Sequence, residues 1–485
     1  MTTIQQALHI LRKDVRHLRF ELAATGLLLV ILMSTSVQTW EGLQESGGRT
    51  PDPAGPLTVL LLISWCLLIA RVIQTEALPG DRHFWLTRPY SRAGLVLGKA
   101  LFIVAFINLP LLVTQAAIVS MDGLPLSANL GGLFGNQLLL SVVVLLPVSA
   151  IAALTRNLAQ FLPAAVLVGA VLAAPILERR GYGDLDWVPS VLAGVITVAI
   201  AGFILWRQYR LRRSVNTALW GAAATAVGII VYAAFPQSAA FAVQSQLKGP
   251  PDGPFALSLG QPAPRDQDTV TVNRFRQLVA FPIVVEGANP EDLRIQSAEL
   301  TLKTLSGVRR RTRAQVEVVE GHLRYVASLD RTFFDAAKDS PVHLEAEVYL
   351  TQYGNARSAD VPLDGTPVYI PGPGQCGVVA GYSRRRFVCR SAFRSPQPFQ
   401  SDQVVPWGGF DPLRGTWFVP RLAFLVYPIA SRSYQFVDDD NHLAPASPLR
   451  PTSLLVRDPV AYFRHTMDAP NVRLGDFAIG AAGGR

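Results

Sequence analysis

Charged residues are scarce in this 485-residue sequence, and the shortage indicates its class. Only 16% of the residues are charged and 50% are hydrophobic, whereas typical soluble proteins are about 25% charged. Several apolar runs before residue 240 are long enough to cross a bilayer. The sequence therefore predicts a membrane protein. Its formal charge of +9 is explained more simply by basic loops beside membrane spans than by nucleic-acid binding.

Cysteine is nearly absent, with three residues in the chain. Cys66 lies in an apolar run and is expected to be a packing residue. Cys376 and Cys389 flank "CGVVAGYSRRRFVC", a pattern typical of two short strands around a polar turn. Cysteines that face each other across a hairpin can have the separation that a disulfide needs. We predict a disulfide in an oxidising compartment; two unpaired thiols in a sheet are the alternative.

Signatures of catalysis and of metal binding are missing from the sequence. There is no G-x-x-x-x-G-K-[ST], so the chain is not expected to bind ATP itself. H-E-x-x-H, C-x-x-C and G-x-S-x-G are also absent. The run "DDDNH" (438–442) lacks the glycine and distal glutamate of a calcium loop, which favours a solvated turn. We predict no enzyme activity, no cofactor and no metal in this chain.

Apolar segments dominate the first half of the chain, and each is near the length of about 20 residues that a bilayer requires. We place seven spans near residues 21–40, 56–75, 99–120, 134–154, 158–178, 188–206 and 216–236. With the N-terminus inside, thirteen Lys and Arg residues fall in inside segments and three, Arg49, Arg179 and Arg180, fall outside. This bias predicts a multi-pass protein of the cell (inner) membrane with a cytoplasmic N-terminus and an extracytoplasmic or periplasmic C-terminal domain.

The segment before the first span is polar and basic. Apolar residues recur at helical spacing, and basic residues form another face; the apolar set is Ile4, Leu8, Leu11, Val15 and Leu18. Residues 1–20 are therefore predicted to be an amphipathic helix in the membrane interface. A helix that packs on another part of the protein is the alternative.

The second half of the chain is predicted to be β-rich. "VHLEAEVYL" (342–350) alternates apolar and polar residues, as in a half-buried antiparallel strand. Further strands are expected at 269–273, 281–286, 298–305, 314–319 and 416–428. Many short strands with Pro/Gly turns suggest a sandwich-like soluble domain. The arginine-rich "GVRRRTR" (307–313) is predicted to connect two strands as a charged hairpin tip, with an anion-binding site as the alternative.

Three uncharged polar residues, Asn108, Gln115 and Gln137, fall inside predicted spans. They can line a pathway or form hydrogen bonds between helices. Prolines within the spans would bend the helices and free backbone carbonyls; these are Pro110, Pro147, Pro163 and Pro175. Because few acidic residues lie inside the spans, a proton relay of buried carboxylates is disfavoured.

The loop "LPGDRHFWLTRPYSRAGLVLGKALF" (78–102) contains more arginine, aromatic and proline residues than a plain connection between two spans requires. Asp81 is a good N-cap for a short helix that presents Phe84, Trp85 and Leu86. Pro89 ends that helix, and Ser91 can cap the one leading into the third span. The topology places this short helix at the cytoplasmic surface.

This loop resembles the coupling segment of the type-2 class of ABC transporter permeases, whose corresponding loop often reads "FWLTRPISR…LL..K". The residues from Phe84 to Pro89, Ser91 with Arg92, and Lys99 match that pattern, and Tyr90 takes the variable hydrophobic place. The basic helix before the first span is similar to the family's N-terminal connecting helix. The resemblance covers about residues 1–210. The chain departs from the family in its seventh span and its large outside domain.

The resemblance implies a six-span permease-like unit at 21–214, after the interfacial helix at 1–20. We assign 215–237 to the seventh span, 238–260 to a linker and 261–485 to the β-rich extracytoplasmic domain. A separate ABC ATPase subunit would bind ATP and Mg²⁺, and a second permease unit would form a homo- or heterodimer in the lipid bilayer. Phe84, Trp85 and Leu86 would contact the ATPase, and Arg82, Arg88 and Arg92 would pair with it or with lipid.

Two other functions compete with this exporter permease. A membrane-anchored binding or sensing protein would use the outside β-domain to recognise a ligand. A membrane-embedded enzyme is disfavoured by the missing catalytic motifs. For the loop itself, aromatics lying at the headgroup layer are the alternative to ATPase contacts.

Overall fold

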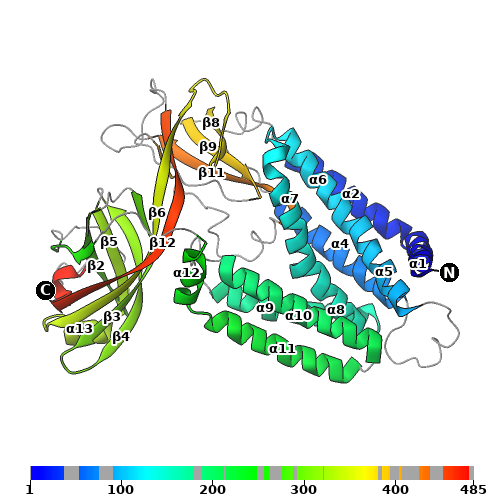
Figure 1. Cartoon of the computed structure of the whole chain (residues 1–485), viewed down its shortest axis with the longest axis horizontal. Helices are drawn as coiled ribbons and strands as arrows, with labels where there is room; N and C mark the ends of the chain where they lie inside the picture. Colours follow the sequence, from blue (N-terminus) through cyan, green and yellow to red (C-terminus); the bar gives the residue numbers. More distant parts are fainter. Residues whose placement is uncertain are drawn as a thin grey trace. The chain divides into compact units, whose positions relative to one another are not determined.

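The computed structural model describes residues 2–37, 54–75, 91–178, 187–211, 214–247, 256–262, 275–287, 292–319, 322–380, 385–393, 404–406, 425–436 and 452–479. The chain divides into two compact units (Figure 1). The first consists of Met1–Arg180, Ser190–Ala234 and Arg357–Val456. The second consists of Gly181–Pro189, Phe235–Ala356 and Arg457–Arg485. The long strands β6 (Val342–Val361) and β12 (Thr452–Val472) therefore contribute to both units.

The first unit contains the predicted membrane region. Its α-helices are α1 (Thr3–His17), α2 (Arg19–Ser36), α4 (Ala54–Gln74), α5 (Arg92–Ile103), α6 (Leu109–Met121), α7 (Leu126–Leu140), α8 (Leu146–Leu154), α9 (Leu158–Glu178), α10 (Trp187–Leu211) and α11 (Ser214–Ala234). Within the residues that the structure describes, five helices are long and apolar enough to cross a membrane: Arg19–Ser36, Pro56–Gln74, Arg92–Met121, Leu126–Leu154 and Val191–Arg210. The described apolar parts of α9 and α11 are shorter, at Leu158–Gly169 and Asn216–Tyr232. A multi-span helical region is therefore confirmed, and the count of seven spans stays a prediction.

Two of the long helices contain a π-helical segment in the same position relative to a proline. The segment η2 (Val104–Asn108) joins α5 to α6 just before Pro110, and η3 (Ser141–Leu145) joins α7 to α8 just before Pro147. A proline cannot donate to the carbonyl four residues earlier, and its ring clashes with that carbonyl. In the wider π turn, backbone hydrogen bonds join residues five positions apart instead of four. This alternative pattern explains why the helices continue through their prolines.

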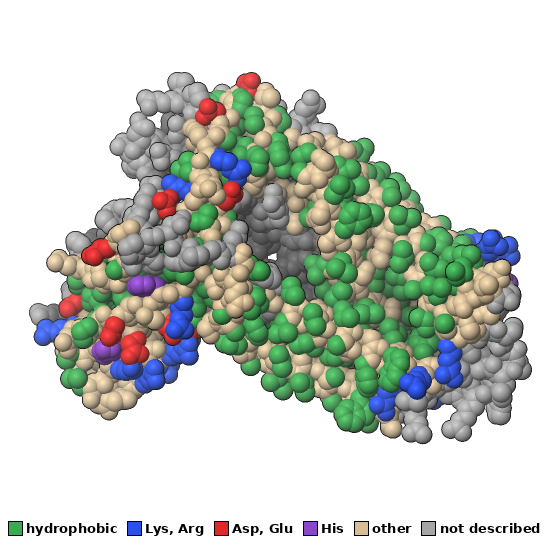
Figure 2. Space-filling view, in the orientation of Figure 1, with side chains coloured by type: hydrophobic (Ala, Val, Ile, Leu, Met, Phe, Trp, Pro, Cys, Tyr) green, Lys and Arg blue, Asp and Glu red, His purple; other side chains and the backbone are tan. Residues whose placement is uncertain are grey.

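A core of large apolar side chains holds the helical bundle together. Trp65 of α4 is fully buried among residues from α2, η2 and α8, including Leu32, Ile107 and Ala152. On the outside, apolar side chains such as Leu138 and Val166 are largely exposed. Figure 2 shows this hydrophobic covering over the helices. A helix that is apolar on all sides suits a lipid environment, because lipid tails replace water around it.

The first unit also contains a five-stranded antiparallel sheet. Its strands are β7 (Val368–Ile370), β8 (Gly374–Ala380), β9 (Arg385–Ala392), β10 (Val404–Pro406) and β11 (Ile429–Phe436), in the order β10-β11-β9-β8-β7. Phe387, Cys376 and Cys389 share one core with Val361 of β6 and Val456 of β12. Cys376 lies directly opposite Cys389 in the β8–β9 register, and the two form the predicted disulfide.

The second unit is built on a seven-stranded sheet in the order β1-β2-β5-β4-β3-β6-β12. Besides β6 and β12, its strands are β1 (Ala256–Leu259), β2 (Arg276–Glu286), β3 (Leu293–Thr304), β4 (Arg309–Val319) and β5 (His322–Asp330). One face is covered by α13 (Arg331–Ala337) and the 3-10 helix η6 (Leu474–Phe477), which contribute Phe334 and Phe477 to the core. The short helix α12 (Gln237–Ser245) places Phe241 against Tyr349 and Tyr462.

The strand predictions can be checked residue by residue. The alternation of "VHLEAEVYL" is confirmed for Val342 to Val348 in β6, but Tyr349 is buried as well. Strands cover 281–286, 298–304 and 314–319 as predicted. Residues 269–273, 416–424 and 438–442 lie outside the described residues. The end of the predicted strand at 416–428 is wrong, because Leu425 and Val426 form a helical turn.

Candidate functional site

Most of the predicted coupling segment lies outside the described residues. These positions are Asp81, Arg82, Phe84, Trp85, Leu86, Arg88 and Pro89. The structure describes Thr75, the last residue before the gap, and Ser91 and Arg92, the first two after it. The elements that hold the two ends of this loop are described by the structure.

Ser91 begins α5 as an N-cap, as its position in the sequence predicts. Its hydroxyl oxygen accepts a hydrogen bond from the backbone N–H of Gly94 at 3.0 Å. The same residue is bound by α1, because the side-chain oxygen of Gln6 accepts from the backbone N–H of Ser91 at 3.0 Å and from its hydroxyl at 2.8 Å. The N-terminal helix thus contacts the first described residue after the loop.

Two glycines allow α1 and α5 to approach closely. A Cβ added at Gly98 would lie 3.2 Å from the backbone oxygen of Ala7 and 3.2 Å from Cγ2 of Ile10. A Cβ at Gly94 would lie 3.0 Å from Oε1 of Gln6. Small residues four positions apart on one helix face are typical of close helix packing in membranes. The two helices therefore meet backbone to backbone along this face.

A buried ion pair fixes the same interface. The Nζ atom of Lys99 on α5 lies 2.7 Å from Oδ2 of Asp14 on α1, and the side chains are 5% and 2% exposed. Isolated buried charges are very unfavourable, so this pair stabilises both charges. Any displacement that separated α1 from α5 would break the ion pair. The two helices are therefore expected to move together.

Other described residues near the loop ends are also linked across helices. Arg71 near the end of α4 forms an ion pair with Glu21 of α2. Gln74 donates to the hydroxyl of Thr155 at 2.9 Å, and Arg92 donates to the backbone oxygen of Arg210 at 3.4 Å. Figure 2 shows Lys and Arg side chains gathered at this end of the helical bundle. Such a basic end matches the cytoplasmic side expected from the sequence.

The predicted amphipathic helix at 1–20 is present as α1, with a capping box formed by Thr2 and Gln5, and its position in the membrane interface stays a prediction. Its buried face consists of Ala7, Ile10, Asp14 and the following Leu18 rather than the full predicted stripe. Ile4 is 63% exposed and Leu8 is 42% exposed. The helix thus packs on α5 and also leaves an apolar edge outside that packing.

A second buried ion pair lies at the opposite end of the span Arg92–Met121. Asp122 is the C-cap of α6, and its carboxylate pairs with Arg390 of β9. Both side chains are almost fully buried, at 0% and 1% exposed. The C-terminal end of a helix carries partial negative charge, so an anion there needs a neighbouring cation. This pair connects the five-stranded sheet to the membrane span that begins at the loop.

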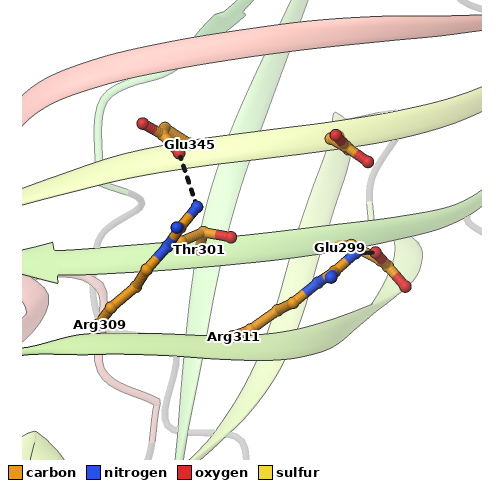
Figure 3. Close-up of a pocket in the computed structure, with 6 residues that line it drawn as sticks. Glu299, Thr301, Arg309, Arg311 and Glu345 are labelled. Atoms are coloured by element: carbon orange, nitrogen blue, oxygen red, sulfur yellow. Dashed lines mark hydrogen bonds and ion pairs between the residues drawn. The ribbon is translucent and has the colours of Figure 1, made fainter.

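The arginine-rich segment forms a different structure from the predicted connection. The turn is Leu305–Val308, and Arg309, Arg310 and Arg311 lie within β4. Figure 3 shows Arg309 and Arg311 pointing toward acidic residues on β3, the neighbouring strand, and on β6, the strand beyond it. Arg311 pairs with Glu299, and Nη2 of Arg309 lies 3.8 Å from Oε2 of Glu345.

The pKa shifts of the side chains on this face of β3, β4 and β6 are those expected of paired charges. A hydrogen bond from Lys303 is the main cause of the lowered pKa of Glu345, and a hydrogen bond to Glu299 is the main cause of the raised pKa of Arg311. A pocket on this surface is lined by Glu299, Thr301, Arg309, Arg311, Glu345 and Glu347. Opposite charges on adjacent strands stabilise a sheet. Within the described residues, no cluster suitable for a metal ion occurs.

The three polar residues predicted inside the membrane all form hydrogen bonds between helices. Asn108 donates to the hydroxyl of Ser141 at 3.1 Å, and Gln137 donates to Oε1 of Gln115 at 3.0 Å. Sequence reasoning missed their neighbour Asn136, which adjoins Gln137 in the sequence. It also missed Asp14. This residue is the one acid among the basic residues of α1, and it follows Ala7 and Ile10 at helical spacing on the buried face, which is a recognisable signal. Nothing local in the sequence indicates that Arg390 pairs with Asp122.

Comparison with known proteins gives no relative: no family model, no curated protein and no solved structure matches the chain.

Proposed function

We propose that this chain is the membrane-spanning permease subunit of an ABC-type exporter, with no catalytic activity of its own. A separate ATPase subunit would bind ATP and Mg²⁺ and contact the 79–92 segment. The observation that best supports the proposal is the buried Asp14–Lys99 pair. It joins the N-terminal helix to the first helix after the loop, so a force on either element reaches the same membrane span.

The mechanism follows from this rigid connection. Movement of the ATPase would push the short helix that carries Phe84, Trp85 and Leu86. Ser91 and the α1–α5 contacts would carry the push into the span Arg92–Met121. At the other end of that span, the Asp122–Arg390 pair would carry it to the disulfide-bonded sheet. Two such units, as a homo- or heterodimer, would alternate between two arrangements of their bundles.

The second candidate is a membrane-anchored binding or sensing protein. The Asp122–Arg390 pair supports it too, because a ligand bound to the extracytoplasmic sheet could then act on a membrane helix. This candidate needs no ATPase and assigns no role to the aromatic residues of the loop. It therefore differs from the permease in its cytoplasmic partner.

Co-purification distinguishes the two candidates. The permease proposal predicts that the tagged chain, extracted in mild detergent from its own host, retains an ABC ATPase. Trp85→Ala combined with Arg88→Ala should reduce that recovery at least tenfold, and Arg12→Ala on the exposed face of α1 is the matched control. If no ATPase is recovered and the double variant changes no phenotype, the permease proposal fails. A reporter fused at residue 250 that is active only in the cytoplasm would overturn the topology.

A further inference from the structure

Three amide side chains come together between α6 and α7 in the predicted outer half of the membrane. They are Gln115, Asn136 and Gln137, and each is at most 9% exposed. Gln115 lies six residues before the end of α6, roughly 9 Å along the helix axis at about 1.5 Å per residue. Polar groups in an apolar bundle are costly unless they are hydrogen-bonded. Their shared location therefore needs an explanation.

The chain itself fills part of this cluster. The backbone oxygen of Leu425 accepts hydrogen bonds from Nε2 of Gln115 and Nδ2 of Asn136, both at 3.0 Å. The backbone oxygen of Val426 accepts from the same Gln115 nitrogen at 3.1 Å. The side chains of Leu425 and Val426 are 4% and 0% exposed and belong to the core of the helical bundle. A piece of peptide backbone thus occupies a polar site among membrane helices.

This occupant leaves one polar atom of the cluster unused. Oε1 of Gln137 is buried and has no hydrogen-bond partner among the described residues. A buried acceptor without a donor costs free energy of about 1–3 kcal/mol. The cluster therefore offers N–H donors for carbonyl oxygens and an acceptor for an N–H donor. That combination is complementary to a peptide unit, and the 425–426 backbone uses only the donor half.

The polar groups also extend beyond the occupant. The hydroxyl of Ser141 donates to the backbone oxygen of Gln137 at 2.8 Å, and Asn108 donates to that hydroxyl at 3.1 Å. Asn108 ends one π-helical segment and Ser141 begins the other. Such segments are frequent at functional sites. A simple anchor for residues 425–426 would need only the amides that contact them, whereas this row of polar groups continues toward the middle of the helices.

We propose that Gln115, Asn136 and Gln137 form a binding site for a peptide-like ligand, which the backbone of Leu425–Val426 occupies until the ligand displaces it. The ligand presents an amide carbonyl, an amide N–H and apolar side chains. Because the built-in occupant is on the same chain, it competes at an effective concentration of the order of millimolar. A short free peptide is therefore expected to act only at high micromolar to millimolar concentration.

The test measures release of the occupant in the full-length chain in lipid nanodiscs. Leu425→Cys is introduced together with Cys66→Ser, and labelling of residue 425 by N-ethylmaleimide is timed. The probe is acetyl-Leu-Val-Tyr-amide, used up to about 10 mM, and its control is the same peptide with the leucine carbonyl reduced to methylene. The intact peptide should accelerate labelling about tenfold, and the reduced peptide should not. Gln137→Met should abolish the acceleration, whereas Phe134→Leu on the exposed face of α7 should retain it.

Two outcomes overturn the proposal. If labelling has the same rate with and without peptide, residues 425–426 are a permanent anchor. If the reduced peptide accelerates labelling equally, the site recognises apolar surface and not amides. Should the Leu425→Cys chain not fold, saturable binding of the radiolabelled peptide to the unmodified chain replaces the labelling, and absence of such binding overturns the proposal. Neither measurement includes an ATPase, so the result is independent of the proposed transport function.

Discussion

Removing one charge of the Asp14–Lys99 pair should detach the N-terminal helix from the membrane bundle. Lys99→Met keeps the length and apolar stem of the side chain but removes the cation that lies 2.7 Å from the carboxylate of Asp14, a side chain that is 2% exposed. Breaking a buried pair in this way typically costs about 3–5 kcal/mol. At about 1.4 kcal/mol per factor of ten, the docking equilibrium of α1 should shift by roughly two to four orders of magnitude.

Hydrogen–deuterium exchange of the chain in nanodiscs measures this shift directly. Amides of α1 that need undocking in order to exchange should lose about 100-fold or more of their protection in Lys99→Met. The double variant Asp14→Leu with Lys99→Met should recover most of it, because the buried carboxylate is then removed together with its lysine. Arg12→Met, on the exposed face of α1, is the control and should change little. If protection in Lys99→Met stays within threefold of the parent, or if the double variant is as poorly protected as the single one, the ion pair does not hold α1 on the bundle.

Three further predictions follow from the geometry. Replacing both Cys376 and Cys389 with alanine should lower the free energy of unfolding of the sheet by about 2–5 kcal/mol, as measured by denaturant titration; maleimide labelling of both cysteines in the unreduced, denatured parent would contradict the disulfide. Gly98→Ala should lower the melting temperature, because the new Cβ would lie 3.2 Å from a backbone oxygen of α1. Gly131→Ala is the control, because a Cβ there meets nothing within 4 Å, and it should stabilise its helix by roughly 0.5–1 kcal/mol. If the two variants shift the melting temperature equally, the close approach of α1 and α5 at Gly98 is not what limits that position. Glu345 has a folded pKa below its ordinary value of 4.5, mainly because a lysine donates a hydrogen bond to it. Its contribution to stability is therefore present above pH 4.5 and is lost as the pH falls through the lower folded pKa. The melting temperature of the parent should consequently fall more steeply below pH 4.5 than that of Glu345→Gln, and equal slopes would contradict the pairing.

Local sequence patterns predicted much of this architecture. The apolar runs gave the helices because length and hydropathy are properties of a single segment. The alternation at Val342–Val348 gave a strand face for the same reason. Ser91 was recognisable as an N-cap, since capping depends on neighbours three residues away. Cys376 and Cys389 could be paired because the hairpin between them is short.

Contacts between distant segments were beyond the same reasoning. Asp122 and Arg390 are 268 positions apart, and only the fold brings them together. The turn at Leu425 and Val426 has the apolar composition of a strand, and its burial among helices overrides that local preference. Residues 357–456 belong to the unit of the membrane helices, although their composition resembles that of the rest of the β-rich half. Such assignments depend on packing across units of the chain, which periodicity does not report.

Contact between the 79–92 loop and an ATPase, as proposed here, can be captured with a photocrosslinker at position 85. Trp85 is replaced with p-benzoylphenylalanine in the host membrane, and the products are identified by mass spectrometry. We expect a crosslink to the nucleotide-binding subunit of an ABC transporter, which Arg88→Ala should weaken. Crosslinks to lipid alone, with none to an ATPase, would place the aromatic residues at the headgroup layer and rule out the permease proposal.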